Sequence, residues 1–439
     1  MSRTTVRWVA LALSLGSAVA AAQPAPDPAP PPADGSAAPA PPPVPAPVPP
    51  PDPTPTTPSG GQPVPNAGGA NTSANTEPKA PSSSVSFGGF LQPQYRLRQD
   101  SPAANDNDGF KFARARLTAT GQTHLGSLSI SGYIEAELQP QFSLFDAYAT
   151  FAAPLPNRGK LIIDAGQMRV PIGRQALLSD TRLSFVDKAA LATLVPDRDL
   201  GTRATLTVPA LPQVRLIGGV FDGEGKNQVE NINERFLYVA RIEISPFGGG
   251  PNGISTGEAP IQESAFAGDF LTVAASYAHN NVLDGSFNNI QIWAGADVAF
   301  AWKGLSGEAE YLWQKQSYEG GAGSEGTTPP ATFHARGWVG QLAYLLPIEL
   351  PPIHKSRLEV GVRVEEIDRN DTTPITVIGD PNQSVLEYTA IVSYYLKGHS
   401  IKLQLAASHF TEIEDKTATN ANASYPNDQL LLQLTYRLE

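Results

Sequence analysis

The sequence contains no cysteine, and it is poor in charge, since only 17% of its 439 residues are Asp, Glu, Lys or Arg. Without cysteine the chain cannot form a disulfide scaffold, a thiolate metal site or a cysteine nucleophile. Acidic residues outnumber basic ones, 42 to 31, which gives a formal net charge of -11. This balance disfavours nucleic acid and anionic membrane surfaces as partners.

Aromatic side chains are missing from a long N-terminal stretch. No Phe, Tyr or Trp lies between Trp8 and Phe87, whereas 22 of the 42 prolines lie between Pro24 and Pro81. A segment without large side chains to bury cannot offset the entropy lost on ordering. Residues 23–84 are therefore predicted to be a disordered Pro/Ala-rich linker, either a simple semi-rigid spacer or a segment that contacts peptidoglycan.

Residues 1–22 have the pattern of a secretory signal peptide. Arg3 and Arg7 precede an apolar run, and small residues lead to a cleavage site after Ala22. The apolar run is well below the ~20 residues that a helix needs to span a bilayer. The pattern predicts export, with the linker in the periplasm.

From Val85 onward, apolar and polar residues alternate. In the segment 357–365, four apolar residues (Leu358, Val360, Val362 and Val364) share one face, and four charged residues (Arg357, Glu359, Arg363 and Glu365) share the other. This period of two indicates β-strands with one apolar face. Sixteen such runs are predicted, at 85–98, 109–121, 126–138, 144–152, 159–169, 201–208, 213–221, 235–245, 269–279, 289–302, 304–315, 334–346, 355–366, 385–396, 399–409 and 429–438.

The connections between these runs favour a transmembrane barrel over a β-sandwich, which is the alternative that period two allows. Most connections after even-numbered runs are short, with 246–268 as the exception, and several after odd-numbered runs are long and polar. Aromatic residues near strand ends are the expected lipid girdle: Trp302, Trp313, Tyr394, Phe410 and Tyr436. We expect an all-β fold, a 16-stranded antiparallel transmembrane β-barrel over residues 85–439.

The connection 170–200 is the longest after an odd-numbered run, and a loop of this length calls for a function. It contains apolar residues such as Leu177, Leu183 and Phe185, which could pack against an inner wall. We interpret it as a candidate constriction loop folded into the barrel; the alternative is an external lid.

Arginines gather on the expected inner face near this loop. They are Arg96, Arg98, Arg114, Arg116, Arg169, Arg198 and Arg203. Guanidinium groups stay charged and present forked donors to oxyanions, so a wall of them could line a path for anions. Carboxylates also lie nearby, and a structural network of Arg and carboxylate pairs is an equally good reading.

Several local strings resemble the phosphate-selective porin O/P family. They are Phe112-Ala-Arg-Ala-Arg-Leu117, Asp146-Ala-Tyr148, Ala165-Gly-Gln-Met-Arg-Val-Pro-Ile-Gly173, Pro196-Asp-Arg-Asp-Leu-Gly201 and Gly219-Val-Phe-Asp-Gly223. The resemblance implies a sixteen-stranded channel, usually trimeric, with basic residues at the constriction. It supports Arg114, Arg116, Arg169 and Arg198 as constriction residues.

Motifs for catalysis are missing. The six histidines form no closely spaced metal-binding pair, and the sequence has no Gly-x-Ser-x-Gly nucleophile elbow. The string Gly223-Glu-Gly-Lys226 lacks the spacing of a phosphate-binding loop. We expect neither enzymatic activity nor a metal or cofactor; a hydrolytic barrel would need a nucleophile beside a base.

These features together predict an outer-membrane porin for passive diffusion of small hydrophilic solutes, with anions such as phosphate favoured. Its expected partners are outer-membrane lipid, the solutes and two further copies of the chain in a homotrimer. The alternative is a structural or adhesive outer-membrane barrel that is tethered through its Pro-rich segment.

Overall fold

The computed structural model describes residues 83–98, 108–228, 230–247, 268–284, 287–320, 330–349, 356–370, 384–412 and 428–438. The predicted signal peptide and nearly all of the predicted linker lie outside these residues. The linker was expected to reach residue 84, but Ser84 already begins the first strand.

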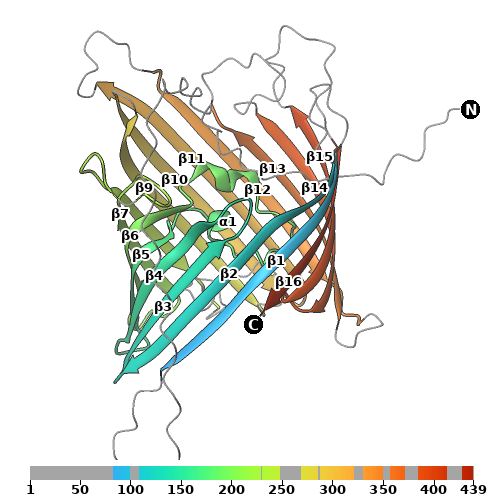
Figure 1. The fold of residues 1–439 in the computed structure, drawn as a ribbon, viewed down its shortest axis with the longest axis horizontal. Helices are drawn as coiled ribbons and strands as arrows, with labels where there is room; N and C mark the ends of the chain where they lie inside the picture. Colours follow the sequence, from blue (N-terminus) through green and yellow to red (C-terminus); the bar gives the residue numbers. More distant parts are fainter. Residues whose placement is uncertain are drawn as a thin grey trace, which may run out of the picture. The chain divides into compact units, whose positions relative to one another are not determined.

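The described residues form sixteen strands that close into an antiparallel barrel, in which β1 pairs with β2 and with β16 (Figure 1). The strands are β1 (Ser84–Arg98), β2 (Gly109–Leu125), β3 (Leu128–Glu137), β4 (Ser143–Pro154), β5 (Lys160–Arg169), β6 (Arg198–Thr207), β7 (Val214–Phe221), β8 (Leu237–Ile244), β9 (Phe270–Asp284), β10 (Phe287–Trp302), β11 (Leu305–Gly320), β12 (Phe333–Leu345), β13 (Arg357–Asp368), β14 (Val385–Lys397), β15 (Ile401–Glu412) and β16 (Asp428–Leu438). Each matches one predicted run. Within the described residues, no helix has the length and apolar character needed to cross a bilayer.

The two faces of the barrel follow the alternation in the sequence. In β13, the side chains of Glu359, Arg363 and Glu365 are buried inside the barrel, whereas Val360 and Val362 are exposed on the outside. Closure pairs the backbone groups of neighbouring strands, and the exposed apolar band outside them has the character that a lipid-facing surface requires. The barrel is thus apolar outside and polar inside.

One predicted girdle residue faces the wrong way. Trp302 is 59% exposed and Tyr436 is 42% exposed, as a lipid-facing position requires, but Phe410 is only 6% exposed. On β15, Phe410 has the same parity as the buried Ser408 and so points inward. The prediction for Phe410 was wrong because a position near a strand end does not by itself fix the face.

The strands run between two rims. Odd-numbered strands end at the upper rim in Figure 1, and even-numbered strands end at the lower rim together with the C-terminus. Residues 303–304 form one of the tight lower turns, where Gly304 has a φ of 91°. The long lower connection 245–269 is the exception expected from the sequence, and only residues 285–286 separate β9 from β10 at the upper rim.

Two β-bulges change which side chains face the lumen. In the pairing of β1 with β2, the register shifts between Gln92 and Pro93, and in the pairing of β3 with β4 it shifts between Glu135 and Ala136. A bulge inserts an extra residue and reverses the alternation beyond it. Both bulges lie beside the charged part of the lumen.

Candidate functional site

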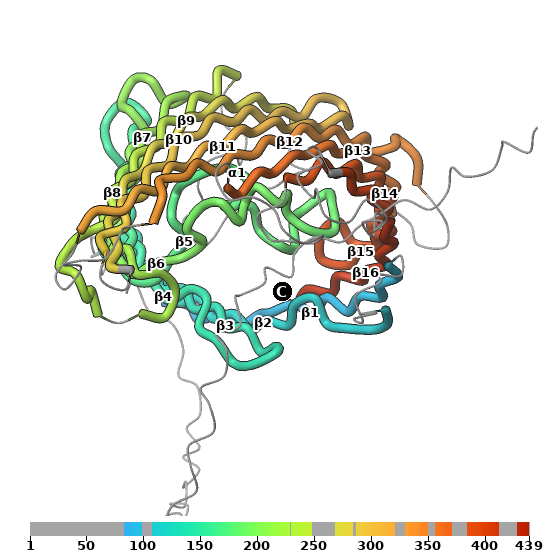
Figure 2. Tube along the Cα trace, turned by 90° about the horizontal axis from the view of Figure 1, so that it is seen from above, coloured from blue at the N-terminus to red at the C-terminus, as the bar shows by residue number. Residues whose placement is uncertain are grey.

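Residues 170–197, the inner segment, connect β5 to β6 and lie inside the barrel (Figures 1 and 2). The segment contains the short helix α1 (Arg174–Leu177) and the 3-10 helix η1 (Ala190–Leu194). Most of its residues are buried although they belong to no strand. The inner segment therefore fills part of the lumen.

One edge of the inner segment packs on the wall formed by β10 to β13. Leu191 and Leu194 of η1 belong to one apolar cluster with Trp293 of β10 and Leu312 of β11. The indole N–H of Trp293 also donates a hydrogen bond of 2.7 Å to the carbonyl oxygen of Leu194. Apolar inner-wall residues thus mark where the segment docks.

Buried carboxylates on the same wall accept hydrogen bonds from α1. Glu308 accepts from Arg174 Nε at 2.9 Å and from Gln175 Nε2 at 2.8 Å, and Glu310 accepts from the Gln175 backbone N–H at 2.7 Å. Gly173, with a φ of 67°, lies so close that a Cβ atom would come within 2.4 Å of Glu310 Oε1. Only glycine fits this approach.

Further along the wall, side chains of β13 to β15 bind backbone groups of the inner segment. Arg363 donates to the Asp187 carbonyl at 2.9 Å, and Glu365 accepts from the Ala190 N–H at 2.5 Å. Further bonds run from Lys402 to Leu183 O, and from Ser393 and Gln404 to Ser184 O. Because buried backbone groups need partners, these bonds fix the course of the segment.

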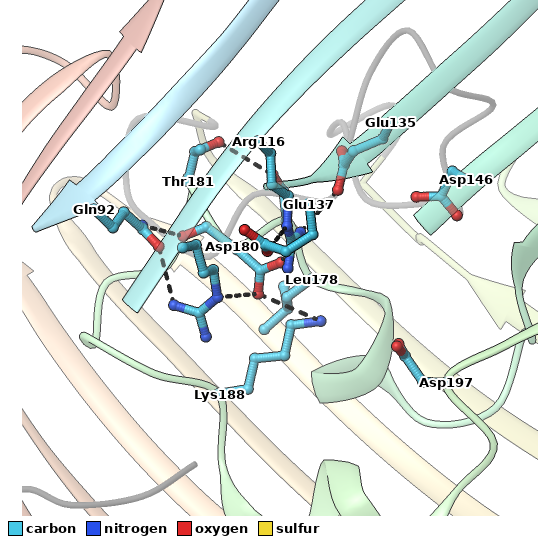
Figure 3. Close-up of polar contacts among 12 residues, drawn as sticks. Gln92, Arg116, Glu135, Glu137, Asp146, Leu178, Asp180, Thr181, Lys188 and Asp197 are labelled. Atoms are coloured by element: carbon cyan, nitrogen blue, oxygen red, sulfur yellow. Dashed lines mark hydrogen bonds and ion pairs between the residues drawn. The ribbon is translucent and has the colours of Figure 1, made fainter. Parts of the chain in front are cut away.

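The opposite edge of the inner segment is charged, and Asp180 lies at its centre (Figure 3). Its carboxylate is 2.7 Å from Arg116, 3.5 Å from both Arg114 and Arg169, and 3.9 Å from Lys188. Burial alone would raise the pKa of Asp180, but the surrounding cations hold it well below its usual range. Asp180 is therefore an anion that joins cations from two strands to the segment.

Lys188 is the lysine of this cluster. Its ammonium donates a hydrogen bond of 2.8 Å to the Ala176 carbonyl. Burial, followed by the like charge of Arg169, lowers the pKa of Lys188 to about 7. The charge of the cluster therefore changes near neutral pH.

The inner segment also contacts the closure of the barrel. Gln92 of β1 donates through Nε2 to the Asp180 carbonyl at 3.0 Å and to Thr435 Oγ1 of β16 at 3.2 Å. One amide thus joins the first strand, the last strand and the inner segment.

Three of the predicted site arginines are held by carboxylates of the wall. Arg116 is 2.7 Å from Glu137 and 2.8 Å from Glu135, and Arg198 is 3.0 Å from Asp146. Arg203 is 2.8 Å from Asp164 on the neighbouring strand. All three guanidinium groups are nearly inaccessible to solvent. They match the reading of a structural network of ion pairs.

Arg114 and Arg169 are less enclosed. Arg114 is 2.9 Å from Asp187, and its side chain is 16% exposed. Arg169 donates to the carbonyl oxygens of Ala176 and Leu178, at 2.8 Å and 2.6 Å. Both hold the inner segment and still reach the lumen.

Arg96 and Arg98 lie apart from this cluster, at the upper-rim end of β1, and both are partly exposed. Lys111 of β2 lies beside them, opposite Gln94. The charges of Arg96, Asp187 and Arg114 all act on Lys111. The structure therefore brings the predicted arginines into two groups, a partly exposed one near the upper rim and a paired one around the inner segment.

Lys111 was missed in the sequence because strict alternation puts it on the face opposite Arg114. The bulge at Pro93 shifts the register, so that Gln94 faces Lys111 while Gln92 faces Arg114. The outward neighbours Phe110 and Phe112 are 87% and 46% exposed, which confirms that Lys111 points inward. The sequence signal for this bulge was Pro93, because proline has no backbone N–H to donate to the neighbouring strand.

Across the described ranges, no three His, Asp or Glu side chains are grouped so that they could hold a metal ion. The acidic residues of the lumen are instead engaged with arginines and backbone N–H groups, as with Glu135, Asp146 and Glu310. These carboxylates therefore pair with arginines of the lumen and hold the inner segment.

Comparison with protein families identifies the chain. The model of a family described as phosphate-selective porin O and P matches residues 85–438, which is the whole barrel. The chain belongs to this family. It is an outer-membrane porin through which small hydrophilic solutes diffuse passively, and porins are channels rather than enzymes.

Solved structures share the barrel fold of this porin. An anion-selective porin from Comamonas acidovorans has 11% sequence identity and a TM-score of 0.51, and the match covers 81% of this chain and 99% of that chain. The outer membrane channel DcaP of Acinetobacter baumannii has 15% identity and a TM-score of 0.50, with 83% and 99% covered. At these identities the similarity concerns the fold alone. No curated protein matches the chain in sequence.

Proposed function

We propose that this porin favours small anions and that the inner segment forms its constriction. The observation that carries the proposal is the group of cations near the upper rim, where the charges of Arg96 and Arg114 act on Lys111 and the carboxylate of Asp187 offsets them only in part. Like charges held together cost free energy, and such a cost is typical of a site that attracts an opposite charge. The family name and the anion-selective porin with the same fold support this preference.

Lys111 is the most suitable residue for testing the anion preference. Within the part of the chain that the structure describes, its ammonium has no carboxylate within ion-pair distance, so removing it leaves no buried acid behind. In planar bilayers under a KCl gradient, the wild-type channel should show a reversal potential of anionic sign. Lys111→Gln should lower the anion-to-cation permeability ratio by about twofold, as expected for one partly hydrated charge.

The matched control is Lys397→Gln, at the exposed lower-rim end of β14, which should leave the ratio unchanged. A wild-type channel with cationic selectivity would refute the anion preference. Equal ratios for the two variants would refute the role of Lys111.

We further propose that residues 1–22 direct export, that residues 23–83 form a periplasmic tether and that three chains associate. The sequence pattern supports the first two, and the family resemblance supports the third. Sequencing the mature N-terminus tests the first part, and the mass of the detergent-extracted protein tests the third. A mature chain that keeps residues 1–22, or a monomer, would contradict the corresponding part.

A further inference from the structure

Phe145 occupies the bulge of β4 and lies among cations of the lumen. The pairing of β3 with β4 joins Glu135 to Asp146 and then Ala136 to Leu144, so that Phe145 is the extra residue. The centre of its ring is 4.1 Å from Arg116 Cζ, 4.4 Å from Arg198 Cζ and 4.0 Å from Lys226 Nζ. One phenyl ring therefore contacts three positive charges.

These three cations differ in how firmly they are held. Arg116 and Arg198 are fixed by carboxylates, as described above. Lys226 has no ion pair or hydrogen bond of its side chain among the described residues, and its contact is the ring. A cation resting on a ring is held weakly compared with a paired one, so Lys226 can exchange the ring for another partner.

The turn that presents Lys226 is itself well fixed. Gly223, with a φ of 86°, donates its N–H to Asp199 Oδ2 at 2.7 Å and accepts at its carbonyl from Asn280 Nδ2 at 2.9 Å. On the other side, the Asn227 N–H donates to Gln167 Oε1 at 2.7 Å. The Gly-Glu-Gly-Lys string, which is no phosphate loop, thus forms a clamped turn that carries one loosely held ammonium.

Burial lowers the pKa of Lys226 from its ordinary value, and the nearby Asp197 only partly offsets this. The protonated ammonium has therefore already lost part of its hydration. Removing the remaining water from this ammonium when a carboxylate binds therefore costs less free energy than at a fully hydrated lysine.

We propose that Lys226 and Phe145 form a binding subsite for aromatic carboxylates. When the ammonium turns from the ring to a carboxylate, the part of the ring that it covered becomes open. A solute whose carboxylate is attached to a flat apolar ring satisfies both groups at once, the ammonium by an ion pair and the ring by aromatic contact. An inorganic anion or acetate satisfies only the ammonium.

The test compares benzoate with acetate as inhibitors of chloride current through single channels. In the wild type, benzoate should act at a concentration roughly threefold to tenfold lower than acetate, as expected for one added aromatic contact. Lys226→Gln and Phe145→Leu should each abolish most of this difference, and the double variant should lose no more than either single one. Lys226→Arg, which keeps the charge, should retain it.

Two controls match these changes. Lys303→Gln removes another lysine that rests on an aromatic ring, 4.9 Å from Trp302, but in a lower-rim turn. Phe151→Leu alters a phenylalanine of the same strand that is exposed on the outer face. Both variants should keep the preference for benzoate. Equal inhibition by the two anions in the wild type, or a preference that survives Lys226→Gln or Phe145→Leu, would overturn the proposal.

The subsite rests on the proposed function only in that the lumen conducts. The reversal potential of the same channels in KCl is recorded before benzoate is added. Cationic selectivity there would refute the general anion preference, whereas the comparison of benzoate with acetate tests the subsite by itself.

Discussion

The inner segment contacts the two walls of the lumen through different kinds of interaction. The wall of β10 to β15 receives it through apolar contacts and hydrogen bonds to its backbone, as at Trp293 and Glu365. The wall of β1 to β6 meets it chiefly through a cluster of charges, as at Arg114 and Arg116, with fewer bonds to its backbone, from Gln92 and Arg169. Bonds to backbone groups and apolar packing fix position, whereas charges near water also act on solutes. We infer that the first wall holds the segment and the second wall forms the passage.

The largest effect should come from breaking the holding wall. Trp293→Ala removes a ring that is only 3% exposed together with its hydrogen bond to Leu194, and such changes cost about 3–5 kcal/mol. The inner segment should loosen, so that single-channel conductance rises and becomes noisier. Trp302→Ala, on the lipid face, should leave the conductance unchanged. If the Trp293→Ala channel keeps the conductance and the low current noise of the wild type, the proposed division of roles between the two walls is wrong.

A smaller effect on stability, and a clear one on selectivity, is expected at the charged wall. Asp180→Asn leaves Arg114, Arg116, Arg169 and Lys188 without their shared carboxylate. Because several of these cations are partly hydrated, the free energy of unfolding should fall by about 2 kcal/mol, less than for a fully buried pair.

The same variant should raise the anion-to-cation permeability ratio by about threefold, since one negative charge is lost from the passage. Reversal potentials and urea unfolding measure the two effects. A ratio that stays the same or falls would show that Asp180 does not face the conducted ions.

The smallest effect is on how ion selectivity depends on pH, and it tests the charged cluster without disrupting either wall. Since the pKa of Lys188 is about 7, its positive charge is present at lower pH and is lost as the pH rises. The anion preference of the wild type should therefore fall by about twofold from about pH 6 to about pH 8, and Lys188→Gln should show little change. An unaltered pH profile in Lys188→Gln would exclude this lysine as the cause.

The lowered pKa of Lys188 also determines how stability changes with pH. An unfolded lysine titrates near a pKa of about 10.4, so between about pH 7 and that value the unfolded chain binds more protons than the folded one. Lys188 thus lowers stability in full below pH 7, and this penalty disappears as the pH rises toward the unfolded value.

The sequence allowed the strand count and the two faces of the barrel to be predicted because period two is a local property. The inward charges of β13 and the outward leucines of β16 follow directly from it. What period two could not provide was the phase beyond a bulge, which is why Lys111 and Phe145 were missed. Phe410 shows the same weakness, since its position along the strand suggested a face that its parity contradicts.

The sequence showed the arginines and the carboxylates near them, but not which carboxylate pairs with which arginine. Arg116 and Arg203 lie where alternation puts them, yet their charge is shared with Glu137 and Asp164 on neighbouring strands. Such pairing depends on the register between strands, which is a long-range property. Arginine composition alone therefore overstates how much free positive charge the lumen offers to solutes.

The amide of Gln92 has a consequence for assembly. It bonds to Asp180 in the inner segment and to Thr435 in the last strand, and the neighbouring Gln94 donates to Gln433 at 3.0 Å across the same seam. If the inner segment were displaced, Gln92 would lose its bond to the Asp180 carbonyl and keep the one to Thr435, so the placement of the segment and the closure of the first strand on the last stabilise each other.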